Sequence, residues 1–160
     1  MMFTASWDKM VRVIDLESNK VVKSFIASKE AIKCMQVNDD YIFVAGCDPI
    51  IRRFDFSEGK MKVFQGHKGW IYCLAIQEEP KPRLFSGGDD RSVIIWDIAT
   101  QKTLETLTGH ENGVTCIGFA NNDMYTGSFD HFINCWDLAD VEERVMEKED
   151  MRWADIESRR

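Results

Sequence analysis

The sequence predicts an all-β chain built from a repeated unit of four short strands, followed by a C-terminal α-helix. Three observations lead to this prediction. Blocks of similar residues, each closing with a large apolar residue and an aspartate, recur about every 40 residues. The segments in and around these blocks are short and rich in β-branched and aromatic residues, as strands are. After residue 139 the chain becomes strongly charged, with apolar residues at helical spacing.

Four blocks align without a gap, at residues 3–15, 43–55, 85–97 and 125–137. Each block opens with an aromatic residue and carries aspartate at its sixth position. In the third block, Gly87 and Gly88 allow a sharp bend, and Asp90 can accept backbone N–H bonds in a turn. Residues 93–96 form a β-branched and aromatic run that favours a buried strand. Each block therefore predicts a strand, a tight turn and a second strand.

Two further strands complete the repeat. One precedes each of the last three blocks, at residues 32–37, 71–76 and 114–119, and one follows each of the first three, at residues 21–25, 61–64 and 104–107. Cys34, Cys73 and Cys116 occupy the same position in the preceding strands, so we predict that all three are small core residues. The first repeat lacks its first strand and the last repeat lacks its fourth, so the terminal repeats are expected to have open edges.

A repeat of four short strands that ends in Trp-Asp resembles the WD40-repeat family. The matching pairs are Gly66-His67, Trp96-Asp97, Gly109-His110 and Trp136-Asp137. The departures are Ile14-Asp15, Ala27-Ser28 and Phe54-Asp55. The resemblance implies a partial WD40 β-propeller of about three and a half to four blades over residues 1–138, with a C-terminal helix or tail over 139–160. The expected blades are 1–26 (partial), 27–65, 66–108 and 109–138, and we expect a fragment or isoform of a larger propeller protein.

The resemblance also implies a hydrogen-bonded network inside each complete blade. The matching residues are His67, Ser86, Asp90 and Trp96 in the third repeat, and His110, Thr126, Asp130 and Trp136 in the fourth. A buried indole N–H needs an acceptor, and a hydroxyl can relay to an imidazole. Because the set recurs and its hydroxyl lies within a strand, we interpret it as structural and predict no catalytic residue.

Composition excludes several other classes of function. The net charge of −7 opposes binding to a phosphate backbone, so direct nucleic-acid binding is not expected. The five cysteines, an odd number without a CxxC pair, are typical of reduced thiols in an intracellular protein of the cytoplasm or nucleus. We find no metal-ligand spacing and no phosphate- or dinucleotide-binding motif, so we predict no metal and no cofactor. No stretch is long and apolar enough to predict a membrane partner.

In the family, partners often bind the face formed by the block turns and by the loops that enter each first strand. The residues expected at this face are Trp7, Trp70, Tyr72, Asp89 and Phe129. Because exposed aromatic residues dominate interface energies, we predict a non-catalytic scaffold or adapter that binds other proteins there, with possible self-association through the open blades. The alternatives are a substrate receptor of a ubiquitin ligase and a scaffold in a ribonucleoprotein complex. Ala99 and Ala139 stand where some ligase receptors have arginine, which gives the first alternative no support.

The C-terminal segment is expected to form a helix that Asp140 caps. Its apolar residues at helical spacing are Val145, Met146, Trp153 and Ile156. Two interpretations remain open. The helix is either solvated, or Trp153 and Ile156 cover the open blade or dock on a partner.

Overall fold

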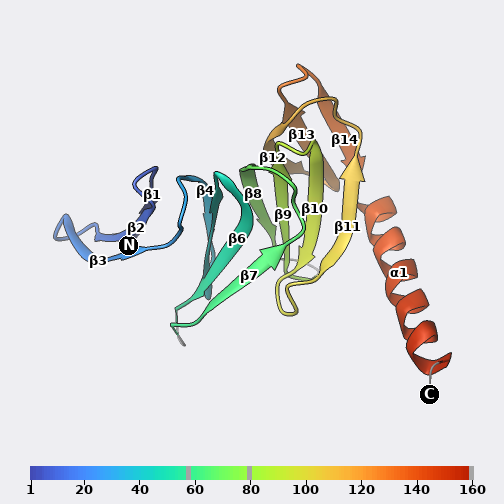
Figure 1. Ribbon diagram of the computed structural model, residues 1–160, viewed down its shortest axis with the longest axis horizontal. Helices are drawn as coiled ribbons and strands as arrows, with labels where there is room; N and C mark the ends of the chain where they lie inside the picture. Colours follow the sequence, from blue (N-terminus) through green and yellow to red (C-terminus); the bar gives the residue numbers. More distant parts are fainter. Residues whose placement is uncertain (57–58, 79–80, 159–160) are drawn as a thin grey trace.

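The computed structural model describes residues 1–56, 59–78 and 81–158, which form four antiparallel sheets followed by one long helix (Figure 1). Within every sheet the strands are hydrogen-bonded in chain order, so each sheet is a simple meander. The predicted fold class, an all-β partial propeller with a C-terminal helix, is confirmed. We number the sheets as blades 1 to 4 from the N-terminus.

The bounds of the elements are as follows. Blade 1 contains β1 (Met2–Ala5), β2 (Met10–Asp15) and β3 (Lys20–Ile26). Blade 2 contains β4 (Ile32–Val37), β5 (Tyr41–Gly46), β6 (Asp48–Asp55) and β7 (Met61–Gln65). Blade 3 contains β8 (Ile71–Gln77), β9 (Arg83–Gly88), β10 (Ser92–Asp97) and β11 (Thr103–Thr108). Blade 4 contains β12 (Val114–Ala120), β13 (Asp123–Ser128) and β14 (Ile133–Asp137), and the helix is α1 (Leu138–Ser158).

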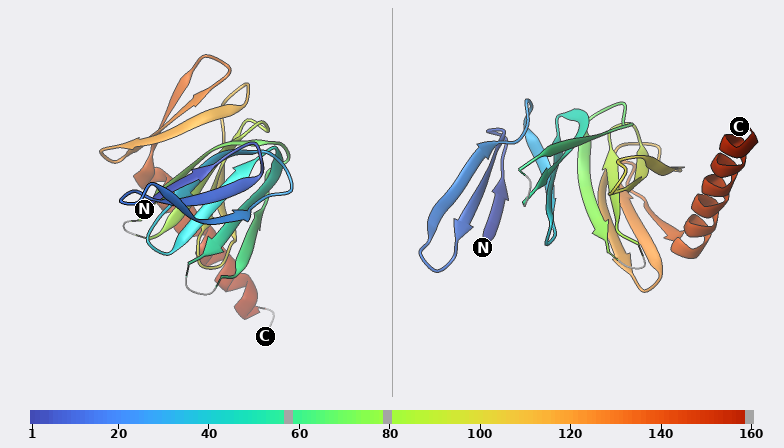
Figure 2. Two further views of the ribbon diagram at one scale, coloured as in Figure 1. Left: turned by 90° about the vertical axis from the view of Figure 1, so that its left-hand side faces the viewer. Right: turned by 90° about the horizontal axis from the view of Figure 1, so that it is seen from below.

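The hydrophobic core lies between adjacent blades. The right-hand view of Figure 2 shows the four sheets side by side in chain order, with α1 beyond the last sheet. Between blades 2 and 3, the fully buried Phe43, Phe64 and Ile71 pack with Trp96. Similar clusters fill the spaces between blades 1 and 2 and between blades 3 and 4. The inner strands β4, β8 and β12 contact one another in succession, which brings the turns at their ends onto one face.

The turn inside each aligned block has a shared geometry in three of the four blades. Lys9, Arg91 and His131, which follow the turn aspartate, have φ of 72°, 66° and 72°. Blade 2 has Pro49 at this position, and the proline ring prevents a positive φ. There the register shifts instead, and Gly46 pairs with Asp48.

Helix α1 begins as soon as β14 ends, which corrects the predicted cap. The carboxylate of Asp137 accepts the backbone N–H of Ala139 at 2.8 Å, so Asp137 caps the helix and Asp140 lies in its first turn. The earlier start places Leu138 in the core between blades 3 and 4. The predicted cap was wrong because Asp137 and Asp140 stand close together in the sequence and either could cap a helix. Packing of Leu138 in the core decides that the helix begins directly after Asp137.

The helix packs against blade 3. Leu138, Val141 and Val145 are buried in one cluster with Leu104 and Leu107 of β11. Two ion pairs fix the same face of the helix: Arg83 with Glu142 at 2.9 Å, and Lys148 with Glu105 at 2.6 Å. The side chains of Trp153 and Ile156 lie outside the described residues, so the two interpretations of that segment stay open.

The three cysteines at equivalent strand positions have different environments. Cys73 is buried and Cys34 is half-buried, but Cys116 is exposed. The prediction that all three are core residues was therefore wrong for Cys116. Blades 2 and 3 each have a following blade that covers this position, whereas no described element covers it in blade 4.

Candidate functional site

The structure brings the four polar residues of blade 3 into one hydrogen-bonded chain. The indole N–H of Trp96 donates to Ser86 Oγ at 2.8 Å, and Ser86 Oγ lies 2.7 Å from His67 Nε2. His67 Nδ1 lies 2.8 Å from Asp90 Oδ2, which also accepts the Lys68 N–H at 2.8 Å. Because the carboxylate only accepts, His67 Nδ1 is the donor in its bond to Asp90. The chain ties the loop that enters blade 3 to the turn between β9 and β10.

Blade 4 repeats this arrangement. Trp136 donates to Thr126 Oγ1 at 2.9 Å, and that oxygen lies 2.8 Å from His110 Nε2. His110 Nδ1 lies 2.8 Å from Asp130 Oδ2, which also accepts the Glu111 N–H at 2.9 Å. Both hydroxyls, of Ser86 and Thr126, are fully buried.

Hydrogen bonding governs the charge of the two carboxylates in these networks. Desolvation by itself raises the pKa of Asp90, but hydrogen bonds from His67, the Lys68 amide and Ser92 outweigh it and hold the pKa well below 3.8. For Asp130 the balance is the same, with the amides of Phe132 and Glu111 and the ring of His110 lowering the pKa to about 2. Both residues are therefore ionised throughout the physiological pH range.

Blades 1 and 2 use arginine where blades 3 and 4 use histidine. Arg12 Nη2 donates to Asp8 Oδ2 at 2.6 Å, and Arg52 donates to both oxygens of Asp48, at 2.6 and 3.1 Å. The Arg52–Asp48 pair is largely buried, with side-chain exposures of 9% and 15%. These pairs were not among the sequence predictions, although arginine at the tenth position of the first two blocks was the available signal.

The five residues expected at the binding face lie together on one side of the molecule. Trp7, Trp70 and Phe129 are 71%, 48% and 54% exposed. The rings of Tyr72 and Phe129 meet edge to face with centroids 5.5 Å apart, and the Tyr72 hydroxyl donates to Asp89 Oδ1 at 2.8 Å. Trp7 joins the others through Lys33, a residue that the sequence analysis did not place here. We call this set the aromatic rim, and its members are Trp7, Lys33, Trp70, Tyr72, Asp89 and Phe129.

Lys33 lies at the centre of the rim. Its ammonium nitrogen is 5.6 Å from the ring centroid of Trp7, 5.1 Å from that of Trp70 and 5.0 Å from that of Tyr72. These distances allow cation–π attraction to all three rings. The rim thus runs from blade 1, across Lys33 of blade 2 and the rings of blade 3, to the turn of blade 4.

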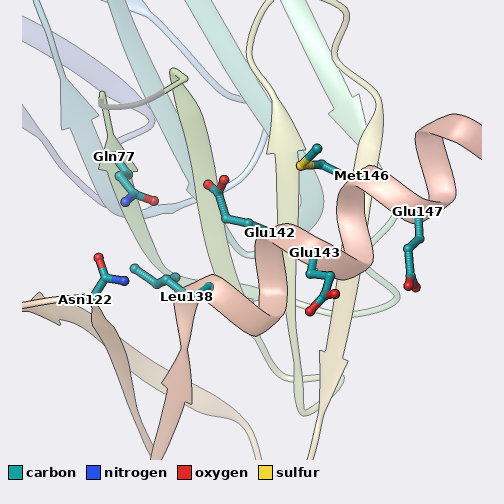
Figure 3. Close-up of a pocket in the computed structure, with 8 residues that line it drawn as sticks. Gln77, Asn122, Leu138, Glu142, Glu143, Met146 and Glu147 are labelled. Atoms are coloured by element: carbon teal, nitrogen blue, oxygen red, sulfur yellow. The ribbon is translucent and has the colours of Figure 1, made fainter.

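A separate pocket of about 580 Å³ lies at the opposite ends of the strands, between α1 and the lower loops of blades 3 and 4 (Figure 3). It is lined by Gln77, Asn122, Leu138, Ala139, Glu142, Glu143, Met146 and Glu147. Glu142 points toward the sheet, where it pairs with Arg83, whereas Glu143 and Glu147 point away (Figure 3). The pocket shares no residue with the aromatic rim.

The described residues contain neither a metal-ligand cluster nor a helix suited to spanning a membrane. Among the described side chains, no group of three or more His, Cys, Asp or Glu is arranged to hold a metal ion. In the same part of the chain, the helix does not have the length and apolar character that crossing a membrane requires.

Comparison with known proteins agrees with the fold. Residues 59–97 and 101–137 each match the family model described as WD domain, G-beta repeat. The chain is 29% identical over 160 residues to an uncharacterized WD repeat-containing protein of Schizosaccharomyces pombe, covering 92% of this chain and 43% of that protein. It is 25% identical over 142 residues to the mitotic checkpoint protein BUB3.3 of Arabidopsis thaliana, covering 89% and 45%.

A third relative and a solved structure extend the comparison. The chain is 34% identical over 134 residues to the U3 small nucleolar RNA-associated protein 15 homolog of Gallus gallus, covering 79% of this chain and 25% of that protein. The crystal structure of the WD40 β-propeller domain of Doa1 superposes with a TM-score of 0.75 at 24% identity, covering 83% of this chain and 45% of that one. The chain spans less than half the length of these relatives. Two matched repeats and a matched fold show that this chain is a WD40-repeat protein, with the architecture of a partial β-propeller.

Proposed function

We propose that this chain is a non-catalytic adapter that binds other proteins through the aromatic rim. The observation that carries the proposal is the continuity of the rim. Three exposed aromatic side chains, carried by three blades, are linked through Lys33 and Tyr72 into one surface. Large aromatic side chains lose hydration favourably and little conformational entropy on binding, so they dominate interface energies.

The polar networks support an adapter and not a hydrolase. A hydrolase needs a hydroxyl that can reach a substrate. Ser86 and Thr126 are fully buried, and each already accepts an indole N–H and neighbours a histidine. Their role in the proposal is to hold the loops and turns that carry the rim.

A second candidate function is favoured by the names of several relatives. They include U3 small nucleolar RNA-associated protein 15 homologs and a ribosome biogenesis protein WDR12 homolog of Oryza sativa. This chain, with its net charge of −7, would join a ribonucleoprotein through protein contacts and not through RNA. Either function fits a location in the nucleus or the cytoplasm, and no observation favours a ubiquitin-ligase receptor over them.

The test removes two aromatic side chains together, with Trp70→Ala and Phe129→Ala. The backbone carbonyl of Trp70, which accepts the Asp89 N–H at 2.8 Å, remains in the variant, so the loop keeps its main anchor. Loss of an interface anchor costs about 2 kcal/mol or more, roughly thirtyfold in affinity. Proteins that co-purify with the wild-type chain and are identified by quantitative mass spectrometry should therefore be lost from the variant.

The matched control is Lys62→Ala with Lys102→Ala, two exposed residues away from the rim. This variant should retain the co-purifying proteins. If the aromatic variant unfolds at a much lower temperature while its folded fraction still retains them, the rings serve packing and the proposal fails.

A further inference from the structure

The environment of Lys33 indicates what kind of partner the rim would bind. Its ammonium lies among the rings of Trp7, Trp70 and Tyr72, so a positive charge stands at the centre of a mainly aromatic surface. Within the described part of the chain, no carboxylate forms an ion pair with it. The acidic member of the rim, Asp89, instead accepts the hydroxyl of Tyr72. The rim therefore presents a positive charge whose anionic partner is not supplied by its own neighbours.

This arrangement selects against a cationic partner. The negative faces of aromatic rings attract cations, but here the ammonium of Lys33 already occupies the position over three rings. A lysine or arginine from a partner would be repelled by it at close range. An anion is attracted, and the surrounding rings lower the local dielectric, which strengthens the attraction.

A nucleic acid is the less suitable anion. Phosphate backbones are bound by several cations that follow the strand, and affinity depends on how many phosphates are neutralised. The rim offers one lysine, and its acidic member Asp89 is exposed, in a chain of net charge −7. A partner that carries a single carboxylate flanked by apolar side chains matches the rim better, because the rim has one ammonium surrounded by aromatic rings.

We propose that the rim binds an extended peptide segment in which an acidic side chain is flanked by aromatic or aliphatic residues. The carboxylate pairs with Lys33, and the flanking side chains pack on Trp7 on one side and on Trp70 and Phe129 on the other. This assignment rests on the function proposed above and specifies the chemistry of the partner.

The experiment uses the full chain and four fluorescein-labelled pools of short peptides, measured by fluorescence anisotropy. In every pool the central residue is flanked by randomised Phe, Trp, Leu and Ile, and that central residue is Glu, Gln, Lys or phosphoserine. An ion pair with a charge-assisted hydrogen bond should make the Glu pool bind about tenfold more tightly than the Gln pool. The Lys pool should bind most weakly.

Variants of Lys33 test whether this residue is responsible. Lys33→Gln should bind the Glu and Gln pools equally, whereas Lys33→Arg should keep the preference for Glu. Lys68→Gln is the matched control, since it removes the same charge from an exposed position in the loop that enters blade 3, and it should behave as wild type. The Arg variant keeps the test informative if the Gln variant folds poorly.

Several results would overturn the inference. For the wild type, these results are equal binding of the Glu and Gln pools, binding of the phosphoserine pool alone, and no binding of any pool. For Lys33→Gln, the contradicting result is a preference for Glu that persists. If all pools bind equally and Trp70→Ala with Phe129→Ala abolishes that binding, the proposed function stands and the assignment of an acidic partner fails. A preference for Glu that survives in this double variant places the acidic site outside the rim, which also contradicts the inference.

Discussion

Replacing Asp90 with alanine should lower the free energy of unfolding by about 3 kcal/mol. The carboxylate accepts hydrogen bonds from His67 Nδ1, the Lys68 amide and the Ser92 hydroxyl, at 2.8, 2.8 and 2.7 Å. The His67 side chain is fully buried, so its N–H would have no acceptor, a loss of about 1.5–3 kcal/mol for a bond to a charged group. Lys68 is exposed, so water replaces part of what its amide loses, whereas Ser92 is buried at the start of β10.

The assay is denaturant unfolding followed by far-ultraviolet circular dichroism, with a thermal scan alongside it. A loss of about 3 kcal/mol corresponds to a fall in Tm of roughly 6–12 °C for a chain of this size. Asp90→Asn keeps one oxygen that can accept the His67 N–H, so it should lose about half as much. Asp40→Ala, which removes an exposed carboxylate, is the control and should change stability by less than about 0.5 kcal/mol. If Asp90→Ala and Asp40→Ala are equally stable, the network does not hold the blade.

The same residue gives a pH dependence whose sign follows from its lowered pKa. Because the pKa of Asp90 is below its ordinary value in the folded protein, the unfolded chain binds the proton first as the pH falls. The stabilisation is complete above the unfolded pKa of about 4 and is lost as the pH drops toward the folded value. Asp90→Asn has no such proton to bind. The stability difference between wild type and Asp90→Asn should therefore shrink between neutral pH and pH about 3, and a constant difference would contradict the assignment.

Two further predictions concern cysteine reactivity and self-association. A thiol reagent should modify the exposed Cys116 and Cys135 quickly and Cys73 slowly, because burial raises the pKa of the Cys73 thiol to about 12. Peptide mass spectrometry measures the modification rate of each cysteine, and equal rates would refute this prediction. Light scattering should give a mass above that of one chain, because β14 has an edge without a partner among the described strands and Phe132 and Ile133 are 67% and 75% exposed. Ile133→Lys should lower that mass, and a wild-type monomer would show that these edges do not associate.

The sequence allowed prediction of the features that form within a single repeat, namely its strands, its turns and its polar network. The aligned blocks place the same residue types at the same strand and turn positions, so the order of strands followed from local pattern alone. The four network positions of blade 3 could be located because the resemblance to the WD40-repeat family assigns them. Ser86 and Asp90 stand ten and six residues before Trp96, as Thr126 and Asp130 do before Trp136, and His67 belongs to the Gly-His pair. These features depend on contacts within one sheet, where the register is fixed by the turn.

Features that depend on neighbouring blades could not be predicted in this way. Cys116 is at a core position by its register, yet it is exposed because no described element packs against that face of blade 4. Lys33 stands in no motif of the repeat, and its contacts come from rings of blades 1 and 3. In both cases the surroundings of the side chain depend on how neighbouring blades pack. A repeat pattern does not place one blade relative to the next.

The networks and the rim are parts of one arrangement. Asp89 directly precedes the network residue Asp90, and Phe129 directly precedes Asp130, so the bonds to His67 and His110 fix the turns that carry these rim residues. A surface whose residues are already held in place loses less conformational entropy when a partner binds. In blade 1 the corresponding turn carries Trp7, and its aspartate is held by the exposed pair with Arg12 instead of a buried histidine. An exposed pair holds its turn less firmly. The rim is therefore best ordered at blades 3 and 4, and a partner should order Trp7 as it binds.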